Sequence, residues 1–174
     1  MPNLLDPKSR IPALDVPLVG GGSFTMAEAS PENFQLIVVY RGVHCPKCKA
    51  QLQEIEPMVA DLRADGHDIV AISMDSEDRA QRAVDEWGLS DLPVAYGLEL
   101  SDAKALGLFI SDAISDAEPD HFAEPGLFAV RADGTLYSQH IQNTPFGRPD
   151  IKDLVSGLNY AVKNDYPVRG TSVA

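Results

Sequence analysis

The only two cysteines in the 174-residue chain, Cys45 and Cys48, lie three positions apart. They enclose Pro46 and Lys47 and follow residues 34–40, a β-branched and aromatic run typical of a strand buried on both faces. A helix is expected to begin at the pair, with Pro46 at its first position, where proline is favoured. The free N–H groups and the dipole of a helix start favour a thiolate at Cys45. Cys48 returns to the same face one turn later, so the pair is suited to reversible dithiol chemistry.

The charge around the pair supports this reading. Acids outnumber bases 26 to 14 in the chain, yet residues 33–53 contain no Asp or Glu. Cations near a sulfur lower its pKa. We therefore expect Cys45 to be the exposed nucleophile with a lowered pKa, and Cys48 to be the more buried resolving thiol. The basic groups of this stretch are Arg41, His44, Lys47 and Lys49.

Two neighbouring polar residues, Arg41 and His44, each have two possible interpretations. Arg41 either binds an anionic or peroxide substrate or pairs with a surface acid. His44 is either a proton relay or a mere neighbour of the first cysteine. Of the other histidines, His67 is expected in a solvated turn and His121 to border the site. His140 is expected to pack across a hairpin.

Three other interpretations of the two cysteines compete with dithiol chemistry. A zinc site needs two more ligands, and the four histidines show no second paired spacing. Covalent haem attachment needs a histidine after Cys48, where Lys49 stands. An inert, buried pair suits Cys48, which lies on an apolar helical stripe, but not Cys45, which precedes the helix. We expect no metal and no cofactor.

The surrounding pattern predicts an α/β fold with a central mixed sheet and helices on both faces. A kink is expected at Pro57, which removes a backbone hydrogen bond within the first helix. Residues 108–124 break the pattern and are interpreted as an inserted loop or short helix. The expected strands are two short pieces over 18–26, then 34–40, 68–74, 92–98, 127–131 and 135–141, and the expected helices are 46–64, one around 80–87, 101–106 and one after Pro149.

Length and composition limit the organisation and the partners. The chain suits one domain over 16–174, preceded by a proline-containing arm over 1–15. Its net charge of −12 argues against nucleic acid and against an anionic membrane surface. No apolar run is long enough to span a bilayer and the first residues lack a secretory signal, so we expect a cytoplasmic location.

Residues 38–48 (VVYRGVHCPKC) resemble the F/Y-R-G-x-W/H-C-P-x-C segment of peroxiredoxin-like proteins. These proteins form the alkyl hydroperoxide reductase and thiol-specific antioxidant branch of the thioredoxin superfamily. Residues 24–26 resemble the N-terminal strand of that family, and residues 124–130 with Asp133-Gly134 resemble its later P-x-x-F-V-I-D-x-D-G strand. The resemblance implies a thioredoxin-like fold from about residue 16 to the end.

The resemblance also implies roles for single residues. Pro125 would be a cis proline facing the dithiol, and Glu124 would lie near the sulfurs and relay protons. The proline and the hydroxyl residue that the family places before its reactive cysteine are replaced here by Val38 and Gly42. The family's later arginine beside the sulfur is replaced by the Pro125 region.

Together these observations predict a redox-active CxxC disulfide in a thiol oxidoreductase that reduces hydroperoxides or disulfides, an antioxidant activity. A thioredoxin-type or glutathione-type system would supply the electrons. The alternative is a redox-sensing or binding module without steady turnover, with residues 108–124 in its partner site. A homodimer through a sheet edge or through 108–124 is left open.

Overall fold

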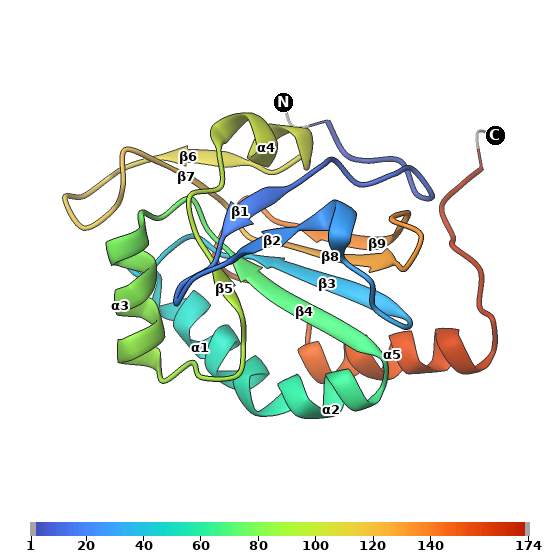
Figure 1. The fold of residues 1–174 in the computed structure, drawn as a ribbon. Helices are drawn as coiled ribbons and strands as arrows, with labels where there is room; N and C mark the ends of the chain where they lie inside the picture. The colour runs from blue at the N-terminus through green and yellow to red at the C-terminus, as the bar shows by residue number, and fades with distance from the viewer. Residues whose placement is uncertain (1–2, 173–174) are drawn as a thin grey trace.

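The computed structural model describes residues 3–172, and a five-stranded mixed sheet lies at its centre (Figure 1). The strand order is β5-β4-β3-β8-β9. These strands span β3 (Phe34–Val39), β4 (His67–Ile72), β5 (Val94–Ala95), β8 (Gly126–Arg131) and β9 (Leu136–Ile141). β4 and β5 run parallel to β3, whereas β8 pairs antiparallel with both β3 and β9. The predicted mixed sheet is confirmed.

β3 is the central strand and leads into the dithiol turn. All six of its residues are buried, as the unbroken run of apolar side chains predicts. Its last residue, Val39, pairs with Ile72 of β4 on one side and with Gly126 of β8 on the other. Because Val39 is paired on both sides, the position at which the chain leaves the sheet towards Cys45 is fixed.

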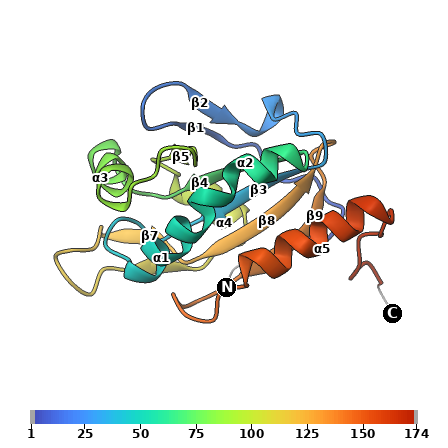
Figure 2. The same cartoon turned by 90° about the horizontal axis from the view of Figure 1, so that it is seen from below.

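Four helices cover one face of the sheet (Figure 2). They are α1 (Pro46–Ile55), α2 (Val59–Ala64), α3 (Glu77–Trp87) and α5 (Ile151–Lys163). The expected kink at Pro57 is present, because a 3₁₀ turn, η2 (Glu56–Met58), separates α1 from α2. Cys48, Leu52, Ile55, Val59 and Leu62 all enter the core cluster on this side, which confirms the predicted apolar stripe.

The opposite face is covered by α4 (Leu100–Ala105) and by a hairpin of β1 (Asp15–Pro17) and β2 (Ser23–Thr25), which continues into a 3₁₀ turn, η1 (Met26–Glu28). The preceding arm packs on the same side, with Ile11 and Leu14 buried beside Ile37 and Val39 of β3. Helices therefore lie on both faces, as expected, although one face carries only the short α4.

Residues 108–124 are not the loop or short helix that the sequence suggests. They form a second hairpin of β6 (Ile110–Asp112) and β7 (His121–Ala123), paired antiparallel with Ile110 opposite Ala123. Each arm contributes only three paired residues, which is too short for a strand pattern to emerge in the sequence. The hairpin ends directly at Glu124, next to β8.

Two further expectations are corrected. The strand predicted over 92–98 shrinks to two residues, because Pro93 has no N–H to donate and Gly97 turns the chain at φ +69°. His67 is fully buried, not solvated: it is the first residue of β4 and its Nε2 lies 2.8 Å from Asn159 Oδ1 of α5. Within residues 3–172, no helix is both long and apolar enough to cross a membrane.

Candidate active site

The two cysteines occupy the turn from β3 to α1. Cys45 is the N-cap of α1 and Pro46 is its first residue, as predicted. The Cys45 sulfur accepts the backbone N–H of Cys48 at 3.2 Å, which satisfies one donor of the helix start. Both residues are free thiols whose sulfurs lie 2.6 Å apart. The pair is therefore placed to exchange between dithiol and disulfide with little change in the turn.

Both sulfurs are enclosed. Cys45 is 1% exposed and Cys48 is 0% exposed. The expectation of an exposed Cys45 is wrong, because a guanidinium from a distant part of the chain lies against the pair. A reagent that reaches this dithiol must be small, or the cover must move.

The cover is Arg148, from the 142–149 loop that precedes α5. Its Nη2 lies 3.1 Å from the Cys48 sulfur and 3.9 Å from the Cys45 sulfur. Its Nη1 donates to the Gln51 side-chain oxygen, and its Nε donates to the Pro145 carbonyl at 2.9 Å. The expectation that the Pro125 region replaces the arginine beside the sulfur is wrong, since Arg148 occupies that place. The one signal in the sequence is weak: Arg148 is the only basic side chain, apart from His140, between Arg131 and Lys152.

The two thiols titrate in opposite directions. Hydrogen bonds from the Cys48 thiol and backbone N–H, together with the charge of Arg148 and a hydrogen bond from Arg41, lower the pKa of Cys45 to about 6. Burial raises the pKa of Cys48, and the neighbouring Cys45 raises it further. The lowered pKa expected for Cys45 alone agrees with this arrangement. At neutral pH the pair holds one thiolate, on Cys45, beside a thiol.

Arg41 lies on the other side of the pair and is already neutralised. Its backbone N–H points to the Cys48 sulfur at 3.4 Å. Its guanidinium pairs with Glu124 at 3.2 Å and Glu118 at 3.7 Å, and lies 4.7 Å from the centre of the Phe122 ring. Of its two interpretations, the pairing with acids is the one present. Glu118 lies between β6 and β7 and is half-buried, whereas Glu124 directly follows β7 and is buried.

His44 also faces this hairpin. Its Nδ1 lies 3.3 Å from Arg79 Nη2, and its Nε2 lies 3.9 Å from Glu118 Oε1. Burial lowers the pKa of His44, and the charge of Arg41 lowers it further. The imidazole is therefore neutral at pH 7, with both nitrogens directed at Arg79 and Glu118.

Gly42 and Asp75 shape the turn before Cys45. The buried Asp75 carboxylate, just after β4, accepts the Val43 N–H at 2.7 Å and pairs with Arg79 Nε at 2.7 Å. A Cβ at Gly42 would lie 2.7 Å from Asp75 Oδ1, and the φ of Gly42 is +133°. The hydroxyl residue of the family pattern therefore has no room at position 42, because a carboxylate fills its space.

Glu124 and Pro125 differ from the expectation. The Glu124–Pro125 bond is trans, so the predicted cis proline is wrong. Hydrogen bonds on both sides, from the Glu124 N–H to Phe109 and from Gln142 to the Pro125 carbonyl, lead the chain from β7 into β8 without a reversal. The Glu124 carboxylate accepts Ser111 Oγ–H at 2.6 Å and pairs with Arg41. It is thus connected to the sulfurs through Arg41.

Other sequence candidates lie at the rim or outside. The Lys47 ammonium is exposed, 5.9 Å from the centre of the Phe146 ring. His121 does not border the dithiol; it is exposed and pairs with Asp112 at 2.9 Å. Among residues 3–172, no three or more His, Cys, Asp or Glu side chains are grouped to hold a metal.

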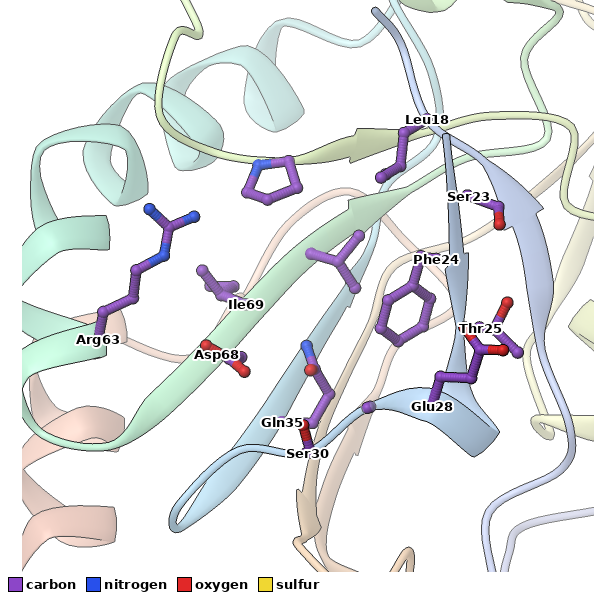
Figure 3. A pocket seen from close by; sticks show the side chains of 13 residues that line it. Leu18, Ser23, Phe24, Thr25, Glu28, Ser30, Gln35, Arg63, Asp68 and Ile69 are labelled. Atoms are coloured by element: carbon purple, nitrogen blue, oxygen red, sulfur yellow. The ribbon is translucent and has the colours of Figure 1, made fainter. Parts of the chain in front are cut away.

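A hollow of about 350 Å³ lies away from the dithiol, beside the first half of β4 (Figure 3). Phe24 and Arg63 approach it from opposite sides, and Asp68 and Gln35 line its floor. It contains neither cysteine nor Arg148. This hollow is therefore separate from the two thiols.

A family model described as the AhpC/TSA family matches residues 7–139, most of the chain. The chain belongs to the AhpC/TSA family. The match includes the dithiol turn and ends before Arg148, so the guanidinium at the sulfurs comes from outside the matched segment. No curated protein matches the chain significantly.

Solved structures of peroxiredoxin-like and thiol peroxidase proteins share the fold at low identity. A peroxiredoxin-like protein from Aquifex aeolicus superposes with a TM-score of 0.73 at 15% identity, covering 91% of this chain and 88% of that chain. AhpC of Mycobacterium bovis gives 0.76 at 13% identity, covering 98% and 99%. A thiol peroxidase from Chromobacterium violaceum gives 0.72 at 15% identity, covering 93% and 91%. The predicted thioredoxin-like, peroxiredoxin-type fold is confirmed.

Proposed function

We propose that this AhpC/TSA-family enzyme is a dithiol peroxidase in which the Cys45 thiolate attacks a hydroperoxide and Cys48 resolves the product. The observation that carries the proposal is the contact of Arg148 with both sulfurs inside an enclosed site, together with the lowered pKa of Cys45. A thiolate is the reactive form of cysteine, so Cys45 is ready to react at neutral pH. Enclosure favours a small hydroperoxide over a protein disulfide as the substrate.

The chemistry balances without a metal or organic cofactor. The Cys45 thiolate attacks the outer oxygen of the hydroperoxide, the O–O bond breaks, and the alkoxide leaves and takes a proton to become an alcohol. This converts Cys45 to a sulfenic acid. The Cys48 thiol then attacks that sulfur, forms the disulfide and releases water. Two electrons from an external dithiol, of thioredoxin or glutathione type, restore both thiols.

The surrounding residues have distinct roles in this proposal. Arg148 stabilises the thiolate and offers a donor to the oxygen that leaves. Arg41 contributes its backbone N–H to Cys48 and a side-chain hydrogen bond to Cys45. Pro46 starts the helix that places Cys48. Glu124 and His44 hold the Arg41 side of the site, whereas Lys47 lies at the rim. An antioxidant role in a reducing compartment such as the cytoplasm belongs to the same proposal.

Rapid mixing of the reduced protein with hydrogen peroxide tests it. Trp87 is a suitable reporter, because it packs in the same core cluster as Cys48 and its ring centre lies 5.9 Å from that of Tyr40. We expect a fast second-order phase in the wild type, no such phase in Cys45→Ser, and a retained first phase in Cys48→Ser. The Cys48→Ser product should be trapped by a sulfenic-acid reagent.

Turnover separates the peroxidase from a redox sensor. With excess dithiothreitol, the wild type should consume many equivalents of peroxide, whereas a sensor would stop near one. A fast phase that persists in Cys45→Ser would contradict the assignment of the nucleophile. Rapid oxidation by glutathione disulfide, with no reaction towards peroxide, would identify a disulfide reductase instead.

A further inference from the structure

The rim of the dithiol carries an aromatic side chain that the chemistry above leaves unused. Phe146, in the 142–149 loop, is 62% exposed, although phenylalanine is normally buried. It lies two residues before Arg148, which covers both sulfurs. A partner that binds Phe146 and shifts the 142–149 loop would therefore also shift Arg148, the side chain that covers the two sulfurs.

A protein that reduces the oxidised pair must displace this cover. Both sulfurs are enclosed, so the thiol of a protein cannot reach either of them while Arg148 stays in place. No carboxylate within residues 3–172 pairs with Arg148; its other partners are the neutral oxygens of Gln51 and Pro145. Oxidation to the disulfide removes the thiolate, the one anionic partner. Arg148 is thus held most weakly in the disulfide form of the protein, which is the form that a reductant must bind.

The charge at the rim indicates the kind of partner. Lys47 lies against the Phe146 ring, and in the described part of the chain neither Lys47 nor Lys49 forms an ion pair with an acid. Residues 33–53 contain no acid, in a chain of net charge −12. Such a basic rim around an exposed aromatic ring attracts an acidic protein surface.

We propose that Phe146 and the neighbouring lysines form the docking surface for an acidic, thioredoxin-type protein reductant, which opens the dithiol by displacing the 142–149 loop. This inference rests on the proposed function. The thiolate of the partner attacks the Cys45 sulfur, the Cys45–Cys48 bond breaks, and Cys48 leaves as a thiolate. That thiolate can accept the Arg41 N–H that already faces it at 3.4 Å. The second thiol of the partner breaks the mixed disulfide, so the partner is oxidised and both cysteines are reduced.

The test compares two reductants for the same full-length protein. Peroxide consumption is measured with a bacterial thioredoxin, its reductase and NADPH, and separately with dithiothreitol, which needs no docking. Phe146→Ala should raise the KM for thioredoxin about tenfold, the size of effect typical of an aromatic anchor at an interface. The dithiothreitol rate should be unchanged. Tyr160→Ala is the matched control: Tyr160 is a similarly exposed aromatic on α5, and its removal should change neither rate.

Salt and proteolysis give independent readouts. Added salt should lower kcat/KM for thioredoxin but not for dithiothreitol, because opposite charges at the rim are screened. Chymotrypsin should cleave after Phe146 faster in the oxidised than in the reduced protein, because the cover is then held less tightly.

Failure of the docking proposal and failure of the proposed peroxidase function give different results. An unchanged KM for thioredoxin in Phe146→Ala, or reduction by glutathione alone with dithiothreitol turnover intact, overturns the docking surface and leaves the peroxidase standing. Equal rates of chymotrypsin cleavage in both redox states would overturn the inference that oxidation loosens the 142–149 loop. A wild type that consumes no peroxide even with dithiothreitol overturns the proposed function itself.

Discussion

Two arginines reach the dithiol from different regions of the molecule, and their surroundings are opposite. Arg41 follows β3 and is neutralised by Glu118 and Glu124 of the β6–β7 hairpin segment. Arg148 comes from the 142–149 loop and, among residues 3–172, contacts neutral oxygens and the two sulfurs but no carboxylate. A cation that is already paired with carboxylates adds little field at a nearby sulfur. Arg148 therefore supplies the positive charge for the thiolate, whereas Arg41 anchors the hairpin.

The largest expected effect follows from removing the unpaired charge. Arg148→Met should raise the pKa of Cys45 and slow peroxide oxidation at pH 6.5 by about 100-fold, a typical cost for losing a charged donor in an enclosed site. Stopped-flow Trp87 fluorescence measures the rate, and thiolate absorbance near 240 nm measures the pKa. Arg82→Met, which removes an exposed arginine of α3, is the control. A wild-type rate in Arg148→Met would reverse the comparison.

A medium-sized effect is expected from pH. Because the pKa of Cys45 is lowered to about 6, the reactive thiolate is present above this pH and is lost as the pH falls through it. The oxidation rate of the wild type should rise about tenfold from pH 5 to pH 7 and then level off. In Arg148→Met the rise should move towards the ordinary range of cysteine. A wild-type rate that keeps rising through pH 8 would show that the thiolate is not stabilised.

The smallest effect is expected on the hairpin side. Glu118→Gln keeps an oxygen for the Ile114 N–H but removes a charge 3.7 Å from Arg41. Arg41 then becomes less neutralised, so the pKa of Cys45 should fall slightly and the rate should change by less than about threefold. The same absorbance titration measures it. A tenfold loss of rate would mean that the hairpin, and not the loop, governs the thiolate.

Local features of the fold could be predicted from the sequence. The buried β3, the break at Pro57 and the capped start of α1 each depend on residues close together in the chain. The direction of the Cys45 pKa was also accessible, because its largest cause, the hydrogen bond from the Cys48 thiol, and the N–H at the helix start both come from a residue three positions away. The two three-residue strands of the β6–β7 hairpin were missed because three residues carry no periodicity.

The other half of the site could not be predicted, because it is assembled over long sequence separations. Arg148 lies 103 positions from Cys45, and Asp75 lies 32 positions from the Val43 N–H that it accepts. Nothing local in a lone loop arginine indicates a sulfur partner. The exposure of Cys45 was misjudged for the same reason, since the residue that covers it could not be located. The cis Pro125 was carried over from the family, and the local hydrogen bonds of this chain do not accommodate it.

The close approach of Gly42 and Asp75 has an evolutionary consequence. The carboxylate occupies the volume of any side chain at position 42, so neither residue can change alone without a clash or a lost partner for the Val43 N–H. Lineages of this fold should therefore divide into two groups. One keeps glycine before the cysteine turn with an acid after β4, and the other keeps a hydroxyl residue there with a smaller residue after β4. Intermediates between these pairings should be rare, so the two positions should be inherited as a unit.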